Sequence, residues 1–193
     1  MKIVVIDGNC IAHKCRFTNS VLFKGAETGV VHQLLETALN LGTVFKTRNV
    51  VFVFDSKHSL RKRKCPWYKQ RRDKRKKELG QSEKKALLSV YRQIDESRRL
   101  LVDMGFSVFL QNGKEGDDLI ASIVNNNVQA RIVICSSDHD IYQVLNKNTE
   151  IVDPDSRKIG KSFTWRKFFH KYGIMPSQWS EYKTINGCKS DEV

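Results

Sequence analysis

The segment KIVVID, Lys2–Asp7, places four apolar residues, Ile3–Ile6, directly before an aspartate. A short apolar run that a charged residue ends at once predicts a buried strand. Three further runs have the same character: Val50–Phe54, Val108–Leu110 and Ile132–Cys135. We therefore expect the chain to be organised around a buried sheet.

Helical stretches alternate with these strands along the chain. They lie near Val30–Phe45, in the segment that begins at Ser82, and at Leu119–Val124. Ser82 is expected to cap the middle helix and Gly105 to end it. The alternation predicts an α/β fold with a mainly parallel twisted sheet flanked by helices. In such a sheet the carboxyl ends of the strands share one edge, where ligands bind.

Acidic residues follow each of the predicted strands. The set, in chain order, is Asp7, Asp55, Glu115, Asp117, Asp118, Asp138 and Asp140. Because the strands end at a common edge, these acids are expected to converge in space. For any one of them, capping of the following helix is an alternative explanation.

Convergence of so many carboxylates has an electrostatic cost. Two carboxylates about 5 Å apart repel by roughly 3 kcal/mol at an effective dielectric of about 20. A few such pairs rival the whole stability of a domain, roughly 5–15 kcal/mol. Oxygen ligands without clustered histidine or thiolate suit Mg²⁺ or Mn²⁺, and two such ions about 4 Å apart are a common device for hydrolysing phosphodiesters. We therefore expect a divalent-metal site at this edge.

The positive charge of the chain is concentrated in RKRKCPWYKQRRDKRKK, Arg61–Lys77. This segment holds eleven cations and one acid, Asp73, and so supplies +10 of the formal net charge of +13. Trp67 and Tyr68 lie within it, and unpaired bases stack on aromatic faces of this kind. A solvated basic loop or a localisation signal is the alternative. We favour nucleic acid as the partner, because a continuous basic segment binds a phosphate backbone by releasing counterions.

Composition narrows the class of protein further. At 193 residues, with 40% hydrophobic and 28% charged residues, the chain suits one globular domain. No apolar run approaches the roughly 20 residues of a membrane span, and Asp7 interrupts the first run too early for a signal peptide. We therefore expect a cytoplasmic protein without a membrane partner. The five cysteines are odd in number and irregularly spaced, which argues against a disulfide framework, and Cys10, His13 and Cys15 lack the further ligands of a zinc site.

Several motifs occur in the order of one known family. They are VIDGN with Asp7, FVFDS with Asp55, PWYKQRRD, EGDDL, SSDHD and YGIMPSQWSEYKTINGCKSDEV. By these motifs, from Lys2 to the last residue, the chain resembles the 5′-nuclease superfamily. This superfamily includes flap endonucleases, phage 5′-exonucleases and the 5′-nuclease domain of bacterial DNA polymerase I. The resemblance implies a protein of a bacterial cell or a phage-infected host.

The resemblance also implies an architecture and roles for basic residues. Residues 1–193 would form a single PIN-like catalytic domain, with a basic helical arch over about residues 56–90 through which a single-stranded 5′ end passes. Lys69 would contact the scissile phosphate with the help of Arg72, and Lys183 in EYKTING would face the site. Tyr68 would stack a base beside the cleavage point. Further arch residues expected to bind DNA are Lys62, Lys64, Trp67, Arg71, Lys74 and Arg75.

The metal ligands implied by the resemblance fall into two groups. The first ion would be held by Asp7, Asp55, Glu115 and Asp117, with Asp118 and Asp138 nearby. The second would be held by Asp138, Asp140 and Asp191. The ions would be Mg²⁺ or Mn²⁺, and the attacking group would be a metal-activated water.

Two departures from the family pattern affect these expectations. The family has Gly-Asp-x-x-Asp near the end, where this chain has GCKSD, so Cys188 stands in place of a carboxylate. A thiol is a poor ligand for Mg²⁺, and the second metal site is therefore expected to be weakened. The family also continues into a helix–hairpin–helix that grips duplex DNA, and this part is absent after Val193. We expect either that the chain is a fragment or that a second polypeptide supplies that half.

Together these features predict a two-metal 5′-3′ exonuclease or flap endonuclease. It would hydrolyse phosphodiesters at 5′ ends or flaps of DNA, with RNA in RNA–DNA hybrids as the alternative substrate that the sequence leaves open. The alternative is a non-catalytic or partner-dependent DNA-structure-binding subunit of a split flap endonuclease. Cys188 and the missing half favour that alternative, whereas Lys69 and the intact first group of acids favour the enzyme. A PIN-type ribonuclease fits less well, because such domains need no basic arch.

Overall fold

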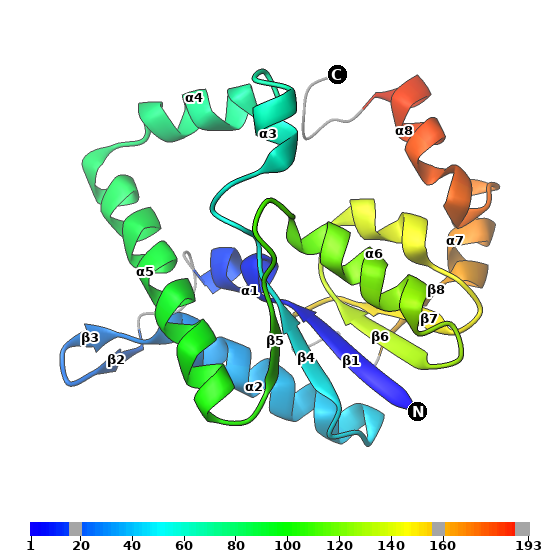
Figure 1. Ribbon diagram of the computed structural model, residues 1–193, viewed down its shortest axis with the longest axis horizontal. Helices are drawn as coiled ribbons and strands as arrows, with labels where there is room; N and C mark the ends of the chain where they lie inside the picture. Colours follow the sequence, from blue (N-terminus) through cyan, green and yellow to red (C-terminus); the bar gives the residue numbers. More distant parts are fainter. Residues whose placement is uncertain (16–20, 156–160, 188–193) are drawn as a thin grey trace.

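The computed structural model describes residues 1–15, 21–155 and 161–187. Its centre is a six-stranded sheet with the strand order β5-β4-β1-β6-β7-β8. The strands are β1 (Lys2–Asp7), β4 (Val50–Val53), β5 (Ser107–Phe109), β6 (Arg131–Cys135), β7 (Thr149–Val152) and β8 (Phe163–Thr164). All neighbours pair in parallel except β7 and β8, which are antiparallel. The predicted α/β fold with a mainly parallel sheet is therefore confirmed (Figure 1).

Helices cover both faces of this sheet (Figure 1). One face carries α1 (Gly8–Cys15), α2 (Gly29–Phe45) and α5 (Gln81–Asp103). The other side carries α6 (Gly116–Asn126), α7 (Trp165–Tyr172) and α8 (Trp179–Asn186), with the 3-10 turns η1 (His139–Val144) and η3 (Pro176–Gln178). A separate hairpin consists of β2 (Leu22–Phe23) and β3 (Ala26–Glu27). No helix in the described part of the chain is long and apolar enough to cross a membrane.

The central strand β1 contributes to the core on both faces. Val4 and Ile6 pack with α1, α2 and α5, while Ile3 and Val5 pack with α6 and η1. This double burial explains why an uninterrupted apolar run, without alternation, forms the strand. The helix that follows begins at Gly8, where a Cβ would lie only 2.2 Å from the Phe54 ring. Glycine therefore allows the chain to turn directly from β1 into α1, with the last strand residue left at the sheet edge.

The ends of the long helix α5 differ slightly from the prediction. The helix begins at Gln81 with Gly80 as its N-cap, so the expectation that Ser82 caps it is wrong. The Gly80 N–H donates to Glu83 Oε2 at 3.1 Å, and this side chain closes the first turn earlier than expected. Gly105 follows the helix with a φ of 84°, as predicted for a residue that ends it.

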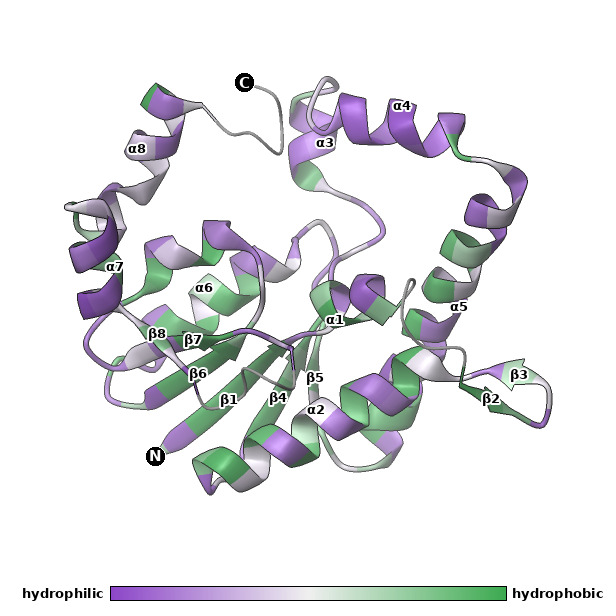
Figure 2. Ribbon diagram, turned by 180° about the vertical axis from the view of Figure 1, so that it is seen from behind, coloured by the Kyte–Doolittle hydropathy of each residue, from purple (hydrophilic) through white to green (hydrophobic). Residues whose placement is uncertain are grey.

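The basic segment folds into two short helices, α3 (Leu60–Lys64) and α4 (Gln70–Glu78), which lead into α5. Neither helix contains a buried residue, and both are strongly hydrophilic in Figure 2. We call residues 60–78 the basic limb. It stands above the carboxyl ends of the strands, opposite α8 (Figure 1). Lys62 pairs with Asp73 within the limb, and Lys76 Nζ donates to the Tyr91 hydroxyl at 2.8 Å, which ties the limb to α5.

Candidate active site

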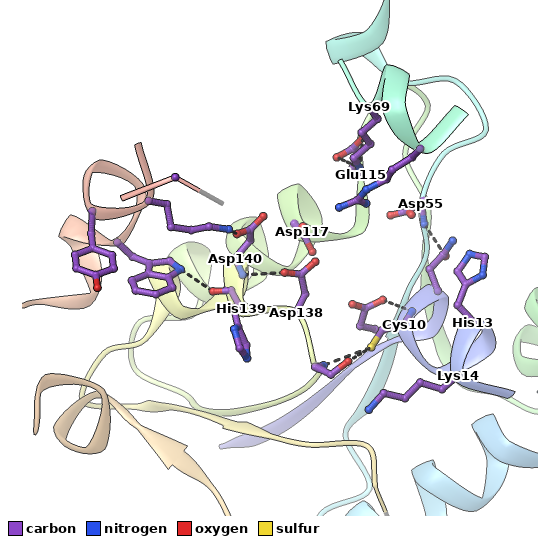
Figure 3. Close-up of a pocket in the computed structure, with 18 residues that line it drawn as sticks. Cys10, His13, Lys14, Asp55, Lys69, Glu115, Asp117, Asp138, His139 and Asp140 are labelled. Carbon is purple, nitrogen blue, oxygen red and sulfur yellow. Dashed lines mark hydrogen bonds and ion pairs between the residues drawn. The ribbon is translucent and has the colours of Figure 1, made fainter. Parts of the chain in front are cut away.

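A cavity of about 740 Å³ opens at the carboxyl edge of the sheet (Figure 3). Most of the predicted metal ligands line it: Asp7, Asp55, Glu115, Asp117, Asp138 and Asp140. The predicted catalytic cations line it too: Lys69, Arg72 and Lys183. The structure therefore brings together acids from four connections of the sheet with cations from the limb and α8. Asp191 and Cys188 lie outside the described residues.

Asp7, the last residue of β1, is oriented by neutral donors. Its Oδ1 accepts the Cys10 N–H at 2.9 Å, at the start of α1, and its Oδ2 accepts the Ser136 hydroxyl at 2.9 Å. Burial raises the pKa of Asp7 to about 6, and the charges of Asp55 and Asp138 add to this effect. The hydrogen bonds thus fix the direction of the carboxylate without balancing its charge.

Asp117, in the first turn of α6, shows the mutual repulsion of the acids more strongly. Burial, followed by the charges of Asp138, Asp7, Asp55 and Asp140, raises the pKa of Asp117 to about 7. A carboxyl group with such a pKa lies in an environment that disfavours its charge. The electrostatic cost expected from converging carboxylates is therefore present in the folded chain.

Asp55, which follows β4, combines a capping role with its place in the cavity. Its Oδ1 accepts the Gly116 N–H at 2.6 Å, at the start of α6, and its own N–H donates to Asn9 Oδ1 at 3.0 Å. A Cβ on residue 116 would lie 3.1 Å from Asp55 Oδ1, so glycine permits this close approach. Asp55 therefore caps α6 and also lies with the other acids in the cavity, so helix capping and convergence both occur.

The SSDHD segment after β6 forms a hydrogen-bonded turn at the cavity. The Asp140 N–H donates to Asp138 Oδ1 at 2.8 Å, and the Asp138 N–H donates to Ser136 Oγ at 3.1 Å. The Ser136 hydroxyl in turn donates to Asp7. On the other side, Lys183 of α8 forms an ion pair with Asp140. The turn therefore connects the acid of β1 with the basic side chain of α8.

Glu115, the N-cap of α6, is held by the base of the basic limb. Lys69 Nζ lies 3.1 Å from both carboxylate oxygens, and the Tyr68 hydroxyl donates to Oε2 at 2.9 Å. Arg61 donates to Oε2 at 2.7 Å and also pairs with Asp118. Burial opposes ionisation, but Lys69, Tyr68 and Arg61 together hold the pKa of Glu115 below its ordinary value. Lys69 adopts a left-handed φ of 58° as the N-cap residue of α4.

The residues predicted to bind DNA lie on the basic limb. Trp67 is 72% exposed, whereas Tyr68 is partly buried because its hydroxyl reaches Glu115. The exposed cations among them are Lys62, Lys64, Arg71, Lys74 and Arg75. An exposed indole among cations is the arrangement expected of a single-strand binding surface. Their contacts with DNA remain a prediction.

Three residues support this site without having been predicted for it. Arg61 bridges Glu115 and Asp118, Ser136 orients Asp7, and Asn9 receives the N–H of Asp55. Asn9 and Ser136 lie inside the motifs VIDGN and SSDHD, which gave a usable signal. Arg61 had no such signal, because it is one of many cations in its segment.

The donor set fits the divalent ions that the resemblance implies. Six carboxylates line the cavity as candidate ligands of a hard cation, and the raised pKa values of Asp7 and Asp117 mark charge that such an ion would balance. Within residues 1–15, 21–155 and 161–187, no three His, Cys, Asp or Glu side chains are already gathered into a ligand group. In the described part of the chain the carboxylates line one cavity without being drawn together at one point, and their division into two ligand sets stays a prediction.

Comparisons with known sequences identify the family of the chain. The family described as 5′-3′ exonuclease, N-terminal resolvase-like domain, matches residues 2–173. DNA polymerase I of Deinococcus radiodurans is 28% identical over 198 residues, covering 99% of this chain and 19% of the relative. A 5′-3′ exonuclease of Buchnera aphidicola is 25% identical over 197 residues, covering 99% of this chain and 64% of the relative. The chain thus spans about a fifth of the first relative and less than two thirds of the second.

Solved structures share the fold. A bacteriophage T5 flap endonuclease in a pseudo-enzyme-product complex with DNA and metal ions has a TM-score of 0.80 at 18% identity, over 97% of this chain and 67% of that chain. Human GEN1 in complex with Holliday junction DNA has a TM-score of 0.62 at 12% identity, over 98% of this chain and 45% of that chain. With the sequence match over most of its length, the chain belongs to the family of 5′-3′ exonuclease N-terminal, resolvase-like domains, within the 5′-nuclease superfamily.

Proposed function

We propose that this domain is a divalent-metal-dependent 5′ nuclease of the 5′-3′ exonuclease and flap endonuclease type. Its substrates are phosphodiesters at 5′ ends or flaps of DNA, and RNA in RNA–DNA hybrids is the alternative substrate to compare in the same assay. The observation that carries the proposal is the meeting of six carboxylates with Lys69, Arg72 and Lys183 in one cavity beneath the basic limb. The name of one relative, 5′-3′ exonuclease, and the description of the matching family support the same reaction class.

The acids of the cavity hold the metal ions in this proposal. Asp7, Asp55, Glu115 and Asp117 hold the first ion, with Asp118 and Asp138 nearby, and Asp138, Asp140 and Asp191 hold the second. Bound divalent ions supply an activated water and neutralise charge on the phosphate. Asp7 suits this role because neutral hydrogen bonds orient its carboxylate and leave its charge unbalanced. With Cys188 in place of a carboxylate, the second site binds Mg²⁺ more weakly than the first.

The cations at the cavity act on the phosphate. Lys69, with its ammonium group now at Glu115, lies where it can approach a phosphate once Glu115 turns toward an ion. A positive charge at this place stabilises the negative charge that develops on the phosphate oxygens. Arg72 from the limb and Lys183 from α8 border the same cavity, so the phosphate is approached from two sides.

The basic limb binds the single-stranded 5′ end. Its helices expose cations that follow a phosphate backbone, and Trp67 offers an aromatic face to a base. In this proposal the limb is the arch through which the strand passes, and Tyr68 stacks a base next to the cleavage point. Binding through many phosphate contacts weakens steeply as salt concentration rises.

The proposal is tested with a 5′-flap DNA duplex in the presence of Mg²⁺ or Mn²⁺. We expect cleavage by the wild-type chain, a loss of at least about 100-fold in Asp55→Asn, and wild-type rates in Asp103→Asn. Asp103 is a matched control because it is an exposed aspartate at the end of α5, remote from the cavity. Tight flap binding without cleavage, even with a partner that supplies a helix–hairpin–helix, would refute the enzyme. It would support the partner-dependent DNA-structure-binding subunit instead.

A further inference from the structure

The first residue of α8, Trp179, is hydrogen-bonded to the turn that carries two predicted metal ligands. Its indole Nε1–H donates to the backbone carbonyl of His139 at 2.7 Å. His139 lies between Asp138 and Asp140, so the bond fixes the peptide group that joins His139 to Asp140. No motif assigned a role to Trp179, and the proposed chemistry does not use it.

Both partners of this hydrogen bond are held rigidly. Trp179 is only 6% exposed. Its ring stacks on that of Tyr182, with 5.3 Å between the ring centroids and 11° between the ring planes. The Tyr172 ring also contacts the Trp179 ring, with 4.8 Å between their centroids. The His139 ring stacks on Tyr142 at 4.9 Å and points away from the carboxylates (Figure 3). The indole therefore holds the carbonyl in one position, and neither side can rotate freely.

The effect of the bond extends across the acids of the cavity. From the peptide held by Trp179, the Asp140 N–H donates to Asp138 Oδ1 at 2.8 Å. The Asp138 N–H donates to Ser136 Oγ at 3.1 Å, and the Ser136 hydroxyl donates to Asp7 at 2.9 Å. A displacement of the peptide at residue 139 would therefore change the directions of the carboxylates that follow it in this series.

A packing role is the simpler explanation for a buried tryptophan, since a buried indole N–H needs an acceptor wherever it lies. Two observations favour more than packing. The acceptor is the carbonyl between two candidate ligands, and Trp179 and Tyr182 both line the cavity itself. Residues that orient metal ligands typically contribute 10- to 100-fold to metal affinity.

We propose that Trp179 is a positioning residue for divalent-ion binding. Through the His139 carbonyl it fixes Asp138 and Asp140, and so sets the affinity of the α8 side of the cavity for Mg²⁺ or Mn²⁺. This role rests on the proposed function, because it assumes that these acids bind metal. It is specific to the indole N–H, and an aromatic ring without a donor would fill the same space without performing it.

The test compares Trp179→Phe with Trp165→Phe in Mn²⁺ titrations of the DNA-free chain by calorimetry. Phenylalanine keeps an aromatic ring and removes the donor. Trp165 is a matched control, since it packs against the same side of the sheet but lies outside the cavity. We expect Trp179→Phe to weaken the binding of Mn²⁺ about 10- to 100-fold and Trp165→Phe to leave it within about twofold. Circular dichroism melting in EDTA checks that both variants fold.

A double-mutant cycle with Asp140→Asn separates positioning from packing. If Trp179 acts through the turn, its replacement should cost much less affinity once Asp140 is already neutral. A purely structural effect would be the same in both backgrounds. A folded Trp179→Phe chain with wild-type Mn²⁺ affinity, or an equal loss in Trp165→Phe, would overturn the inference.

A second measurement keeps Trp179 itself in place and does not depend on how well Trp179→Phe folds. The chain has three tryptophans, so Trp67→Phe with Trp165→Phe leaves Trp179 as the sole emitter. Its fluorescence should change on addition of Mg²⁺ and saturate at the affinity that calorimetry measures. An unchanged emission at saturating Mg²⁺ would count against the role. Flap cleavage is measured in parallel with the chain that keeps all three tryptophans, and it separates the two claims. If that chain binds the ion with the expected dependence on Trp179 but does not cut DNA, only the proposed function is refuted.

Discussion

Replacement of Asp117 by asparagine should stabilise the metal-free protein while it damages the site. The pKa of Asp117 lies at about 7 instead of 3.8, because burial and then the charges of the other acids disfavour its ionised form. Each pKa unit corresponds to about 1.4 kcal/mol, so full ionisation in the folded chain costs roughly 4 kcal/mol. The side chain is only partly buried, and an amide also loses some hydration there. We therefore expect Asp117→Asn to raise the free energy of unfolding by about 1–3 kcal/mol at pH 8 in EDTA.

The gain must depend on pH with a defined sign. Below about pH 4 the carboxyl group is protonated in both the folded and the unfolded chain, and the variant should match the wild type. Between about pH 4 and pH 7 the unfolded chain releases this proton first, so wild-type stability falls as pH rises. Above about pH 7 the carboxyl group is ionised in both states, so the difference in unfolding free energy between the variant and the wild type should reach its full value and stay constant.

Thermal unfolding in EDTA, followed by circular dichroism at pH 4, 6 and 8, measures this gap. For a chain of this length each kcal/mol corresponds to about 2–4 °C in Tm. Asp95→Asn is the control, because Asp95 already forms ion pairs with Lys57 and Arg98 and should gain nothing. Added Mg²⁺ should raise the Tm of the wild type more than that of Asp117→Asn. A variant no more stable than the wild type at pH 8, or a gap that is the same at every pH, would refute the electrostatic reasoning.

Three further outcomes can be checked directly. Lys69→Ala should lower the single-turnover cleavage rate at least about 100-fold and weaken flap binding only slightly. Lys74→Ala, the control, should mainly reduce flap binding. If both variants weaken flap binding equally, Lys69 is one phosphate contact among many. Cys188→Asp should raise activity at low Mg²⁺, and an unchanged Mg²⁺ dependence would mean that position 188 never contacts the ion. Gly8→Ala should lower the free energy of unfolding, measured in a urea titration, by about 1–3 kcal/mol, because its Cβ would lie 2.2 Å from the Phe54 ring; an unchanged free energy would show that the ring moves aside without cost.

The sheet and the convergence of its acids were predictable from the sequence, because both follow from the chain's strongest local signal. A run such as Ile3–Ile6 must be buried on both faces, and a charged residue at its end must lie at the edge. Because the strands are parallel, their carboxyl ends place Asp7, Asp55 and Asp138 close together. Signals that depend on a single polar residue were weaker. Ser82, the predicted N-cap of the long helix, lies inside that helix, whose N-cap is Gly80.

The partners of the acids were not predictable, because they depend on side chains that meet only in the folded chain. Glu115 and Asp117 are two residues apart in one motif, yet their surroundings have opposite effects. Arg61, Tyr68 and Lys69 come from the limb to hold Glu115, while other carboxylates surround Asp117. Periodicity and composition give the number of cations in a segment, but they do not give the one that crosses to a particular carboxylate.

The negative charge of the cavity is therefore balanced on one side and unbalanced on the other. On the side of the limb, Lys69 and its neighbours already balance Glu115, and the pKa of that carboxyl is lowered. On the side of the sheet, burial and mutual repulsion raise the pKa values of Asp7 and Asp117, with Asp138 contributing to both. A divalent ion gains most where negative charge is unbalanced, so we expect it to bind first on the sheet side. Glu115 would share its carboxylate between such an ion and Lys69, whose ammonium group lies 3.1 Å from both of its oxygens, so replacing Lys69 should also alter metal affinity on the limb side.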